Sequence, residues 1–254
     1  MEQHIDTIII TQARLGSTRL PGKVMLKIEG EEMLLIHLKR IAQTQVTNHI
    51  IVATTTNHSD DLIETKVNEW GYNLSRGSED DVLDRFYQAA KPFQPNWVVR
   101  LTSDCPLIDS NIIDAAITFA KMNDVDYCSN ILIEHFPDGQ DVEVFKFSAL
   151  EKAWNEAKLT SEREHVTPYI RNNSDINNGK LFSAVNLPSP TNYSDIRMTV
   201  DEQKDFELMT ELIGELGIKK TWLEYTNYII DNDLQYINKT IIRNEGYLKS
   251  IKND

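Results

Sequence analysis

Cysteine is scarce in this sequence of 254 residues, which contains only Cys105 and Cys128. Their spacing fits no zinc-binding pattern, and the alternatives left are one disulfide or two reduced thiols, of which a chain without a secretory signal favours the second. The N-terminal stretch MEQHIDTIIITQAR has neither a cationic start nor an apolar run long enough for a secretory signal. We therefore expect reduced thiols and a cytoplasmic protein.

Long apolar runs and excess positive charge are also missing. No stretch of 18 apolar residues occurs, so we expect no membrane-spanning helix and no membrane partner. The chain has 26 Lys and Arg against 39 Asp and Glu, a net charge of -13. Because binding to a duplex depends on a basic face, this balance argues against a nucleic-acid partner. A small anionic ligand can still bind at a locally basic site.

The remaining composition is that of a soluble globular protein, with 41% hydrophobic and 26% charged residues. No repeat, low-complexity segment or linker-like break divides the chain, so we expect one domain over residues 1–254. Runs typical of strands are separated by runs with helical spacing of apolar residues. Strands are predicted over 8–11, 49–55, 97–102, 126–130, 142–145, 181–186 and 196–200, and helices over 33–41, 60–70, 82–90, 111–122, 148–157, 161–173 and 202–216.

The stretch TIIITQARLGSTRLPGKVMLKIEG, residues 7–30, combines a buried strand with a turn-prone basic loop. Arg14, Arg19 and Lys23 lie within ten residues of one another in this loop. Cationic side chains and exposed backbone N–H groups are suited to holding a polyphosphate. The alternative interpretation is a solvated basic loop without a ligand.

Two common phosphate-binding motifs are absent. A P-loop has four residues between its glycines and Ser or Thr after the lysine, whereas five residues separate Gly16 from Gly22 and Val24 follows Lys23. The GxGxxG dinucleotide pattern is missing as well. His165 lies in no HEXXH motif and near no signature of a Ser or Cys nucleophile.

Two aspartates follow predicted strands. Asp104 lies two residues past the end of the strand over 97–102, and ligands of open α/β sheets bind beyond the carboxyl ends of strands. Asp201 follows the strand predicted over 196–200. The structural alternatives are an Asx turn at Asp104 and an N-cap at Asp201.

Two further acidic stretches have plain structural explanations. In RGSEDDVLDRFYQAA, residues 76–90, Ser78 is a candidate N-cap, and the acidic residues that follow it complement the helix dipole. Asp231 and Asp233 have the D-x-D form used by metal-dependent glycosyltransferases. Because no strand precedes them, a turn within a helical tail is the favoured interpretation.

The words QARLGSTRLPGK, RLTSDCPLID and RMTVDEQKDFEL together resemble the signatures of the sugar-acid cytidylyltransferases, most closely the spore-coat polysaccharide branch. The resemblance extends in patches to about residue 215. It implies a three-layer α/β/α nucleotidyltransferase fold, GT-A-like and Rossmann-like, with a mostly parallel mixed sheet. It also implies transfer of CMP from CTP to a sugar acid for surface polysaccharide or glycan synthesis, with Mg²⁺ as cofactor and pyrophosphate as product.

The resemblance also implies roles for individual residues. Asp104 and Asp201 would bind the metal, and with Arg14 and Lys23 they would form the catalytic set. The nucleotide-binding set would comprise Gln12, Ala13, Arg14, Gly16, Ser17, Arg19, Lys23, Gly77, Asp80, Asp81, Arg85 and Thr102. The acceptor-binding set would comprise Arg100, Asp141, Glu143 and His165.

For Asp141 and Glu143, solvent exposure is an equally good account. The region around 130–195 would bind the acceptor or form a homodimer contact. One departure from the family pattern is Gln203-Lys204, where Pro-Glu is usual, and it leaves Asp201 in place. Two other functions remain open: a glycosyltransferase acting through Asp231 and Asp233, and a nucleotide-binding protein without catalysis.

Overall fold

A computed structural model describes residues 5–254. At its centre lies a seven-stranded sheet with the order β5-β4-β1-β6-β8-β7-β9. The strands are β1 (Thr7–Gln12), β4 (Ile50–Thr55), β5 (Asn73–Gly77), β6 (Trp97–Thr102), β7 (Tyr127–Ser129), β8 (Glu143–Lys146) and β9 (Ala184–Asn186). Only β8 runs antiparallel to its neighbours, β6 and β7. The prediction of a mostly parallel mixed sheet is confirmed.

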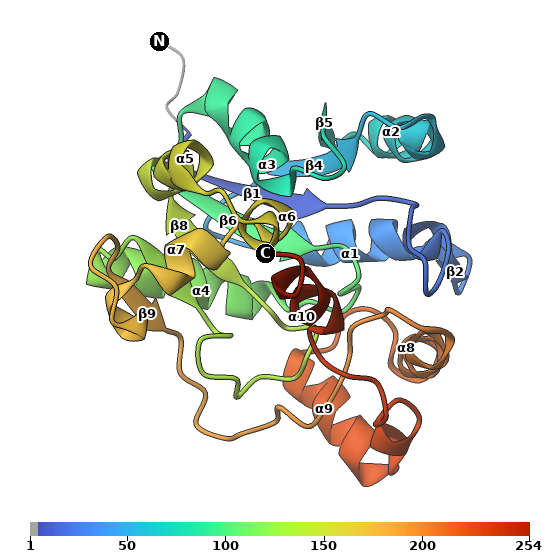
Figure 1. Ribbon diagram of the computed structural model, residues 1–254. Coiled ribbons are helices and arrows are strands. Elements are labelled where there is room, and N and C mark those ends of the chain that lie inside the picture. The colour runs from blue at the N-terminus through green and yellow to red at the C-terminus, as the bar shows by residue number, and fades with distance from the viewer. Residues whose placement is uncertain (1–4) are drawn as a thin grey trace.

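Helices cover both faces of this sheet (Figure 1). One face packs against α1 (Met33–Ile41), α2 (Asp61–Glu69) and α4 (Ser110–Asn123), and the other against α3 (Val82–Ala90) and α5 (Phe147–Glu156). Side chains alternate along a strand, so Ile9 of β1 packs in the first core while Ile8 and Ile10 pack in the second. The chain therefore has the three-layer α/β/α architecture expected from its sequence.

Further elements surround the sheet. A third apolar cluster joins α8 (Gln203–Leu216) and α9 (Trp222–Asp231) to the start of α1. The last helix, α10 (Glu245–Ile251), packs against α6 (Thr160–His165), which brings the C-terminus back toward the centre of Figure 1. The remaining elements are α7 (Pro168–Asn172), a short hairpin of β2 (Lys27–Ile28) and β3 (Glu31–Glu32), and the 3-10 turns η1 (Lys23–Met25), η2 (His58–Asp60), η3 (Lys91–Phe93), η4 (Asp175–Asn177) and η5 (Leu234–Tyr236).

The prediction of a strand over 196–200 is wrong. This segment forms only an isolated bridge, between Asp138 and Arg197. Its backbone bonds go to two separate loops: Met198 N donates to the carbonyl of Asp138 at 2.6 Å, and Val200 N donates to that of Asp104 at 2.8 Å. Because no single strand lies alongside it, the extended segment cannot join the sheet.

Three other local predictions also need correction. The helix predicted over 161–173 is split into α6 and α7 at Val166, whose φ of 71° lies in a region that a helix cannot contain. The N-cap of α3 is Asp81, whose carboxylate accepts the N–H of Asp84 at 2.9 Å, and Ser78 instead accepts the N–H of Asp81 at 3.0 Å. β9 is also shorter than the strand predicted over 181–186.

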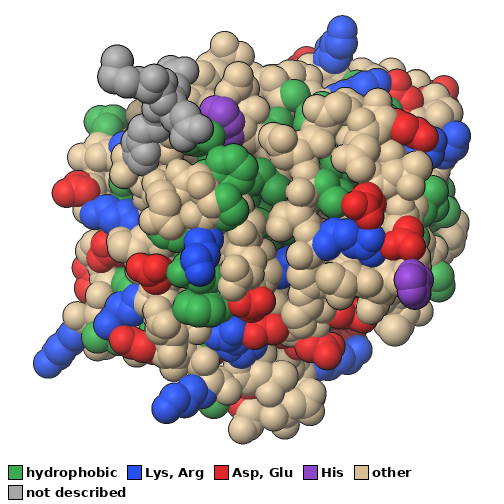
Figure 2. All heavy atoms as spheres, turned by 90° about the horizontal axis from the view of Figure 1, so that it is seen from above, with side chains coloured by type: hydrophobic (Ala, Val, Ile, Leu, Met, Phe, Trp, Pro, Cys, Tyr) green, Lys and Arg blue, Asp and Glu red, His purple; other side chains and the backbone are tan. Residues whose placement is uncertain are grey.

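The surface carries charges of both signs. On the face drawn in Figure 2, Lys and Arg side chains are interspersed with Asp and Glu side chains, and neither sign forms a broad patch. Within residues 5–254, none of the helices combines the length and the apolar character that crossing a bilayer would require.

Candidate active site

A cavity of about 580 Å³ lies beyond the carboxyl ends of β1 and β6. The chain order reverses at these two strands, because β4 and β5 lie on one side of β1 and β6 on the other. Such a switch point is where open α/β sheets bind ligands. The cavity lining brings together most of the predicted site residues: Gln12, Ala13, Arg14, Gly16, Ser17, Arg19, Lys23, Asp80, Arg85, Thr102, Asp104, His165 and Asp201.

The basic loop is fixed in place by backbone contacts. The carboxylate of Asp60 accepts the N–H of Leu15 at 2.8 Å and the hydroxyl of Thr55 at 2.5 Å, which ties the loop to the end of β4. Gly22 donates its N–H to the carbonyl of Leu15 at 3.1 Å and has a φ of 67°, a conformation that glycine adopts without strain. The loop therefore presents its cations from a defined backbone.

Lys23 joins the loop to both predicted metal-binding aspartates. Its Nζ donates to Asp104 Oδ2 at 3.2 Å, to Asp201 Oδ1 at 2.9 Å and to the carbonyl of Val200 at 2.8 Å. Burial opposes the charge of Lys23, but the two carboxylates outweigh it and raise its pKa. Burial likewise opposes ionisation of Asp104, yet Lys23 holds the pKa of this carboxyl well below its usual range. The lysine and Asp104 are therefore both charged near neutral pH.

The other loop cations are also paired with carboxylates. Arg14 lies 2.9 Å from Glu79, and Arg19 lies 3.0 Å from Asp201 and 3.4 Å from Glu245. A phosphate entering the cavity would replace these carboxylates as the partner of the guanidinium groups.

Arg85 differs from the loop cations because it is buried and has no carboxylate partner within salt-bridge distance in the described chain. Its Nη1 donates to the carbonyl of Ser78 at 2.9 Å, while its Nε has no hydrogen-bond partner among residues 5–254. Burial lowers the pKa of Arg85 to about 10. A buried guanidinium with spare donor capacity at a cavity is suited to a polar ligand.

Asp104 and Asp201 both contact the ammonium group of Lys23, which brings their carboxylates close together at the cavity. Among residues 5–254, no group of three or more His, Cys, Asp or Glu side chains is placed to hold a metal ion by itself. Magnesium usually takes only one or two protein carboxylates beside substrate phosphates and water. The aspartate pair therefore fits magnesium that arrives with a polyphosphate.

Two predicted nucleotide contacts lie outside the cavity lining. A Cβ on Gly77 would meet Cγ of Arg85 at 3.1 Å, so this glycine leaves room for the buried arginine. Asp81 caps α3 and forms an ion pair with Arg163. Both positions support the cavity wall around Arg85.

Three predicted acceptor contacts also lie outside it. Glu143 is buried, and its carboxylate accepts hydrogen bonds from Arg100, from the hydroxyl of Tyr127 at 2.6 Å and from that of Thr167 at 2.5 Å. Solvent exposure is thus the wrong account of Glu143. Arg100 does not line the cavity, but its Nη2 donates at 3.4 Å to Oε1 of Gln12, which does.

Asp141, the third of these residues, is held by the C-terminal segment. Its Oδ1 accepts a hydrogen bond from Nη2 of Arg243 at 3.0 Å. Burial raises the pKa of Asp141 to about 7.

The C-terminal helix is a part of the cavity wall that the sequence did not predict. Glu245, Gly246 and Lys249 of α10 line the cavity. Ser250 Oγ lies 2.7 Å from Nε2 of His165, and burial lowers the pKa of that imidazole to about 4, so it is neutral near pH 7. No chemical motif marks this segment, and only its packing on α6 brings it to the site.

The D-x-D segment is remote from this chemistry. Asp231 is the last residue of α9 and Asp233 follows it in a left-handed conformation. Both are exposed, and neither lines the cavity. The interpretation of this segment as a turn in a helical tail is confirmed.

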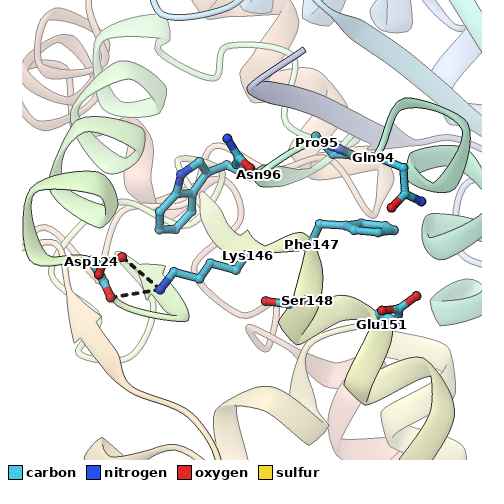
Figure 3. Close-up of a pocket in the computed structure, with 9 residues that line it drawn as sticks. Gln94, Pro95, Asn96, Asp124, Lys146, Phe147, Ser148 and Glu151 are labelled. Carbon is cyan, nitrogen blue, oxygen red and sulfur yellow. Dashed lines mark hydrogen bonds and ion pairs between the residues drawn. The ribbon is translucent and has the colours of Figure 1, made fainter. Parts of the chain in front are cut away.

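A second cavity, of about 430 Å³, lies at the opposite end of β6 (Figure 3). Trp97, at the start of that strand, and Lys146 are among its lining residues. Lys146 is already paired with Asp124, at 3.0 Å. No predicted site residue lines this cavity, and it faces the amino end of a parallel strand, where such sheets rarely bind ligands.

Comparisons with known sequences identify the family of this chain. A model of the cytidylyltransferase family matches residues 8–241. An uncharacterized protein of Methanocaldococcus jannaschii is 44% identical over 80% of this chain and 81% of its own length. The spore coat polysaccharide biosynthesis protein SpsF of Bacillus subtilis is 31% identical over 84% of this chain and 88% of its own. The 3-deoxy-manno-octulosonate cytidylyltransferase 2 of Hydrogenovibrio crunogenus is 30% identical over 75% of this chain and 70% of its own length.

Solved structures agree with the fold. A cytidylyltransferase from Leptospira borgpetersenii superposes with a TM-score of 0.86 at 32% identity, covering 94% of this chain and all of that one. The CTP complex of CMP:2-keto-3-deoxy-manno-octonic acid synthetase superposes with a TM-score of 0.62 at 16% identity over 83% of this chain and 99% of that one, a similarity of fold. Since the family model spans most of the chain and well-covered relatives exceed 30% identity, this protein belongs to the cytidylyltransferase family and is a nucleotidyltransferase.

Proposed function

We propose that this enzyme is a magnesium-dependent cytidylyltransferase that transfers CMP from CTP to a sugar acid and releases pyrophosphate. The proposal is supported by the relatives named for 3-deoxy-manno-octulosonate cytidylyl transfer and for spore-coat polysaccharide synthesis. We further propose that the product serves the synthesis of a surface polysaccharide or glycan.

The loop cations would hold the triphosphate. Arg14 and Arg19 would exchange Glu79 and Glu245 for phosphate oxygens, and Lys23 would turn from the aspartates toward the same group. Guanidinium groups bind phosphate through paired N–H donors, which fixes orientation as well as charge. These cations would then stabilise the negative charge of the departing pyrophosphate.

Asp104 and Asp201 are the residues that would hold Mg²⁺. The bound ion would supply positive charge beside the α-phosphate, where charge develops during transfer. Removing Lys23 from between the two carboxylates frees their oxygens, so binding of the triphosphate and release of the aspartates are parts of one exchange.

The chemical step would need no nucleophile from the protein. A hydroxyl oxygen of the sugar acid would attack the α-phosphorus, forming a new P–O bond while the bond to the α,β-bridging oxygen breaks. Pyrophosphate would leave with the bonding electrons, and the hydroxyl proton would pass to water. Phosphoryl-type transfer depends mainly on positioning and electrostatic stabilisation, which matches a cavity rich in charge and without a catalytic triad.

The observation that carries the proposal is the meeting of the basic loop with Asp104 and Asp201 at the switch point of the sheet. A glycosyltransferase acting through Asp231 and Asp233 is disfavoured because both side chains lie away from this cavity. A role in nucleotide binding without catalysis is disfavoured by membership of an enzyme family.

A pyrophosphate-release assay tests the proposal. The protein is incubated with each of the four nucleoside triphosphates, with Mg²⁺ or EDTA, and with a panel of keto-sugar acids. We expect release only when CTP, metal and an acceptor are all present. Release that is independent of the acceptor, or faster with another triphosphate, would refute the proposed reaction.

We also propose that the region 130–195 forms a homodimer contact. β9 ends the sheet, and an edge strand offers unpaired backbone groups to a second chain. The exposed apolar side chains Ile133, Ile176 and Leu181 lie in the same region. Light scattering of the eluted protein should give twice the chain mass, and Leu181→Glu should shift it toward the monomer. A monomeric wild-type protein would contradict this proposal.

A further inference from the structure

Arg197 is a buried cation in the midst of three carboxylates. Its Nε donates to Asp205 Oδ1 at 2.9 Å, its Nη1 to Asp138 Oδ2 at 2.5 Å and its Nη2 to Asp201 Oδ2 at 2.9 Å. Burial disfavours the charge, but the surrounding carboxylates outweigh this effect and raise the pKa of the guanidinium further. Arg197 is therefore a fixed positive charge behind the site.

The two oxygens of Asp201 have different partners. Oδ2 faces Arg197, whereas Oδ1 faces the cavity, where Lys23 lies at 2.9 Å and Arg19 at 3.0 Å. A carboxylate held at one oxygen can no longer rotate freely. The contact with Arg197 thus leaves a single oxygen of Asp201 available to a ligand in the cavity.

The backbone of Asp201 is fixed by the same network. Asp205, in the first turn of α8, accepts the N–H of Asp201 at 2.9 Å and binds Arg197 through both of its oxygens. The amide of Asn238 donates to the same carboxylate at 2.9 Å. Backbone and side chain of Asp201 are therefore held by one buried cluster.

Arg197 does not line the active-site cavity. Its side chain is 8% exposed and lines a separate cavity of about 520 Å³ beside Asp138 and Asn238. The turn at Gly139 packs against Met198, where a Cβ on the glycine would come within 2.6 Å of a backbone atom, and this close approach brings Asp138 to the guanidinium. Of its three carboxylate partners only Asp201 lines the active-site cavity, so we expect an effect of Arg197 there to pass through Asp201.

We propose that Arg197 is a positioning residue of the active site, which holds Oδ2 of Asp201 so that Oδ1 alone is presented to a divalent metal bound with the triphosphate. The inference rests on the proposed function. Partners that orient metal ligands typically change metal affinity 10- to 100-fold when they are removed. Without Arg197, the carboxylate of Asp201 can rotate, and Lys23 can compete with the metal for both of its oxygens.

The test compares Arg197→Lys with Asp138→Asn. The first variant keeps a positive charge but loses the planar guanidinium that reaches Asp201 and Asp205 together. The second removes a different partner of the same guanidinium by an isosteric change and leaves the contact with Asp201 in place. Binding of Mn²⁺ is measured by electron paramagnetic resonance at saturating CTP, and binding of CTP without metal is measured by calorimetry.

We expect Arg197→Lys to weaken Mn²⁺ binding about tenfold or more, with CTP binding in the absence of metal changed less than threefold. Asp138→Asn should stay within about twofold of the wild type for Mn²⁺. In the background of Asp201→Asn, the arginine substitution should add no further loss, because its effect passes through that carboxylate.

Equal Mn²⁺ affinity in the wild type and Arg197→Lys would overturn the positioning role. A loss of Mn²⁺ affinity in Asp138→Asn as large as that in Arg197→Lys would also overturn it. The cluster would then affect metal binding only by stabilising the fold. If Arg197→Lys does not fold, Asp205→Asn takes its place: a loss of Mn²⁺ affinity with normal CTP binding supports the proposal, and unchanged affinity overturns it. A wild-type protein that binds no Mn²⁺ with CTP would instead refute the proposed function.

Discussion

The ammonium group of Lys23 lies between two carboxylates that are far apart in the sequence, 3.2 Å from Asp104 Oδ2 and 2.9 Å from Asp201 Oδ1. One aspartate follows β6, and the other follows an extended segment outside the sheet. The lysine belongs to the loop after β1, so three distant segments meet at one charged centre. In the proposed reaction, this arrangement would link the binding of a phosphate group by the loop to the release of both aspartates.

Lys23→Ala should therefore weaken CTP binding about ten- to a hundredfold, the effect of losing one charge-assisted contact. Binding of CMP should change less than threefold, because the lysine would face the leaving group. Calorimetry with both nucleotides measures this difference. The control is Lys27→Ala, whose side chain is 61% exposed and pairs only with Glu32 in the described structure. A similar loss for CMP and CTP would show that Lys23 does not contact the leaving group.

Asp104→Asn and Asp201→Asn should each lower turnover by about a hundredfold or more, since each would remove a charged ligand from the proposed metal site. Both variants should remain folded by circular dichroism. Asp231→Asn is the matched control because this exposed carboxylate lies away from the cavity. Normal turnover in either of the first two variants would remove that aspartate from the site.

Glu245→Gln should strengthen CTP binding about two- to fivefold. The glutamate of α10 pairs with Arg19, so the neutral variant frees this guanidinium for phosphate and removes a negative charge from the cavity wall. Glu69→Gln, which breaks the surface pair with Lys66, serves as the control and should leave CTP binding unchanged. Weaker CTP binding in Glu245→Gln would mean that α10 assists the triphosphate directly.

His37 should make folding stability depend on pH. Its ring donates from Nδ1 to the carbonyl of Cys105 at 2.8 Å and accepts from the hydroxyl of Thr11 at 2.9 Å, and burial lowers its pKa to about 4. Between pH 6.5 and 4 the unfolded chain binds a proton that the folded chain excludes. Stability present above pH 6.5 is therefore lost as the pH falls through this window, by about 3 kcal/mol in all.

Urea unfolding from pH 4 to 8 measures this effect in the wild type and in His37→Gln. The variant should lack the His37 contribution, so the difference in unfolding free energy between the two proteins should narrow toward low pH. His58→Gln, at a fully exposed site, should keep the wild-type slope. Parallel curves for the wild type and His37→Gln would contradict the assignment.

Gly139→Ala should destabilise the fold by about 2 kcal/mol or more. A Cβ there would meet the backbone of Met198 at 2.6 Å, and φ at this glycine is 105°, where other residues are strained. Gly214→Ala, within α8 and with open space around its Cα, should be neutral or stabilise by up to about 1 kcal/mol. Chemical denaturation compares the two variants. Equal stabilities would show that the 137–140 turn can move away from Met198.

Much of this site could be predicted because its parts are local in the chain. The basic loop after β1 and Asp104 after β6 each follow a buried strand, and the carboxyl ends of parallel strands share one edge of a sheet. Periodicity and turn chemistry placed these residues beyond strand ends, and the resemblance to the cytidylyltransferases suggested their roles. The segment 196–200 shows the limit of this reasoning, because apolar β-branched residues favour extended backbone without specifying a strand partner.

By itself the sequence determined the alternation of strands and helices and the cationic loop, since these depend on neighbouring residues, while the resemblance to a family singled out the two aspartates. Only the tertiary structure decided that Glu143 is buried against Tyr127, that α10 closes the cavity wall and that Arg197 holds Asp201. The contacts of Glu143 and of α10 depend on packing between elements that are distant in the chain. The contact between Arg197 and Asp201 depends on how the chain bends between them. Burial and pairing of charges are properties of the folded neighbourhood, and no spacing of residue types encodes them.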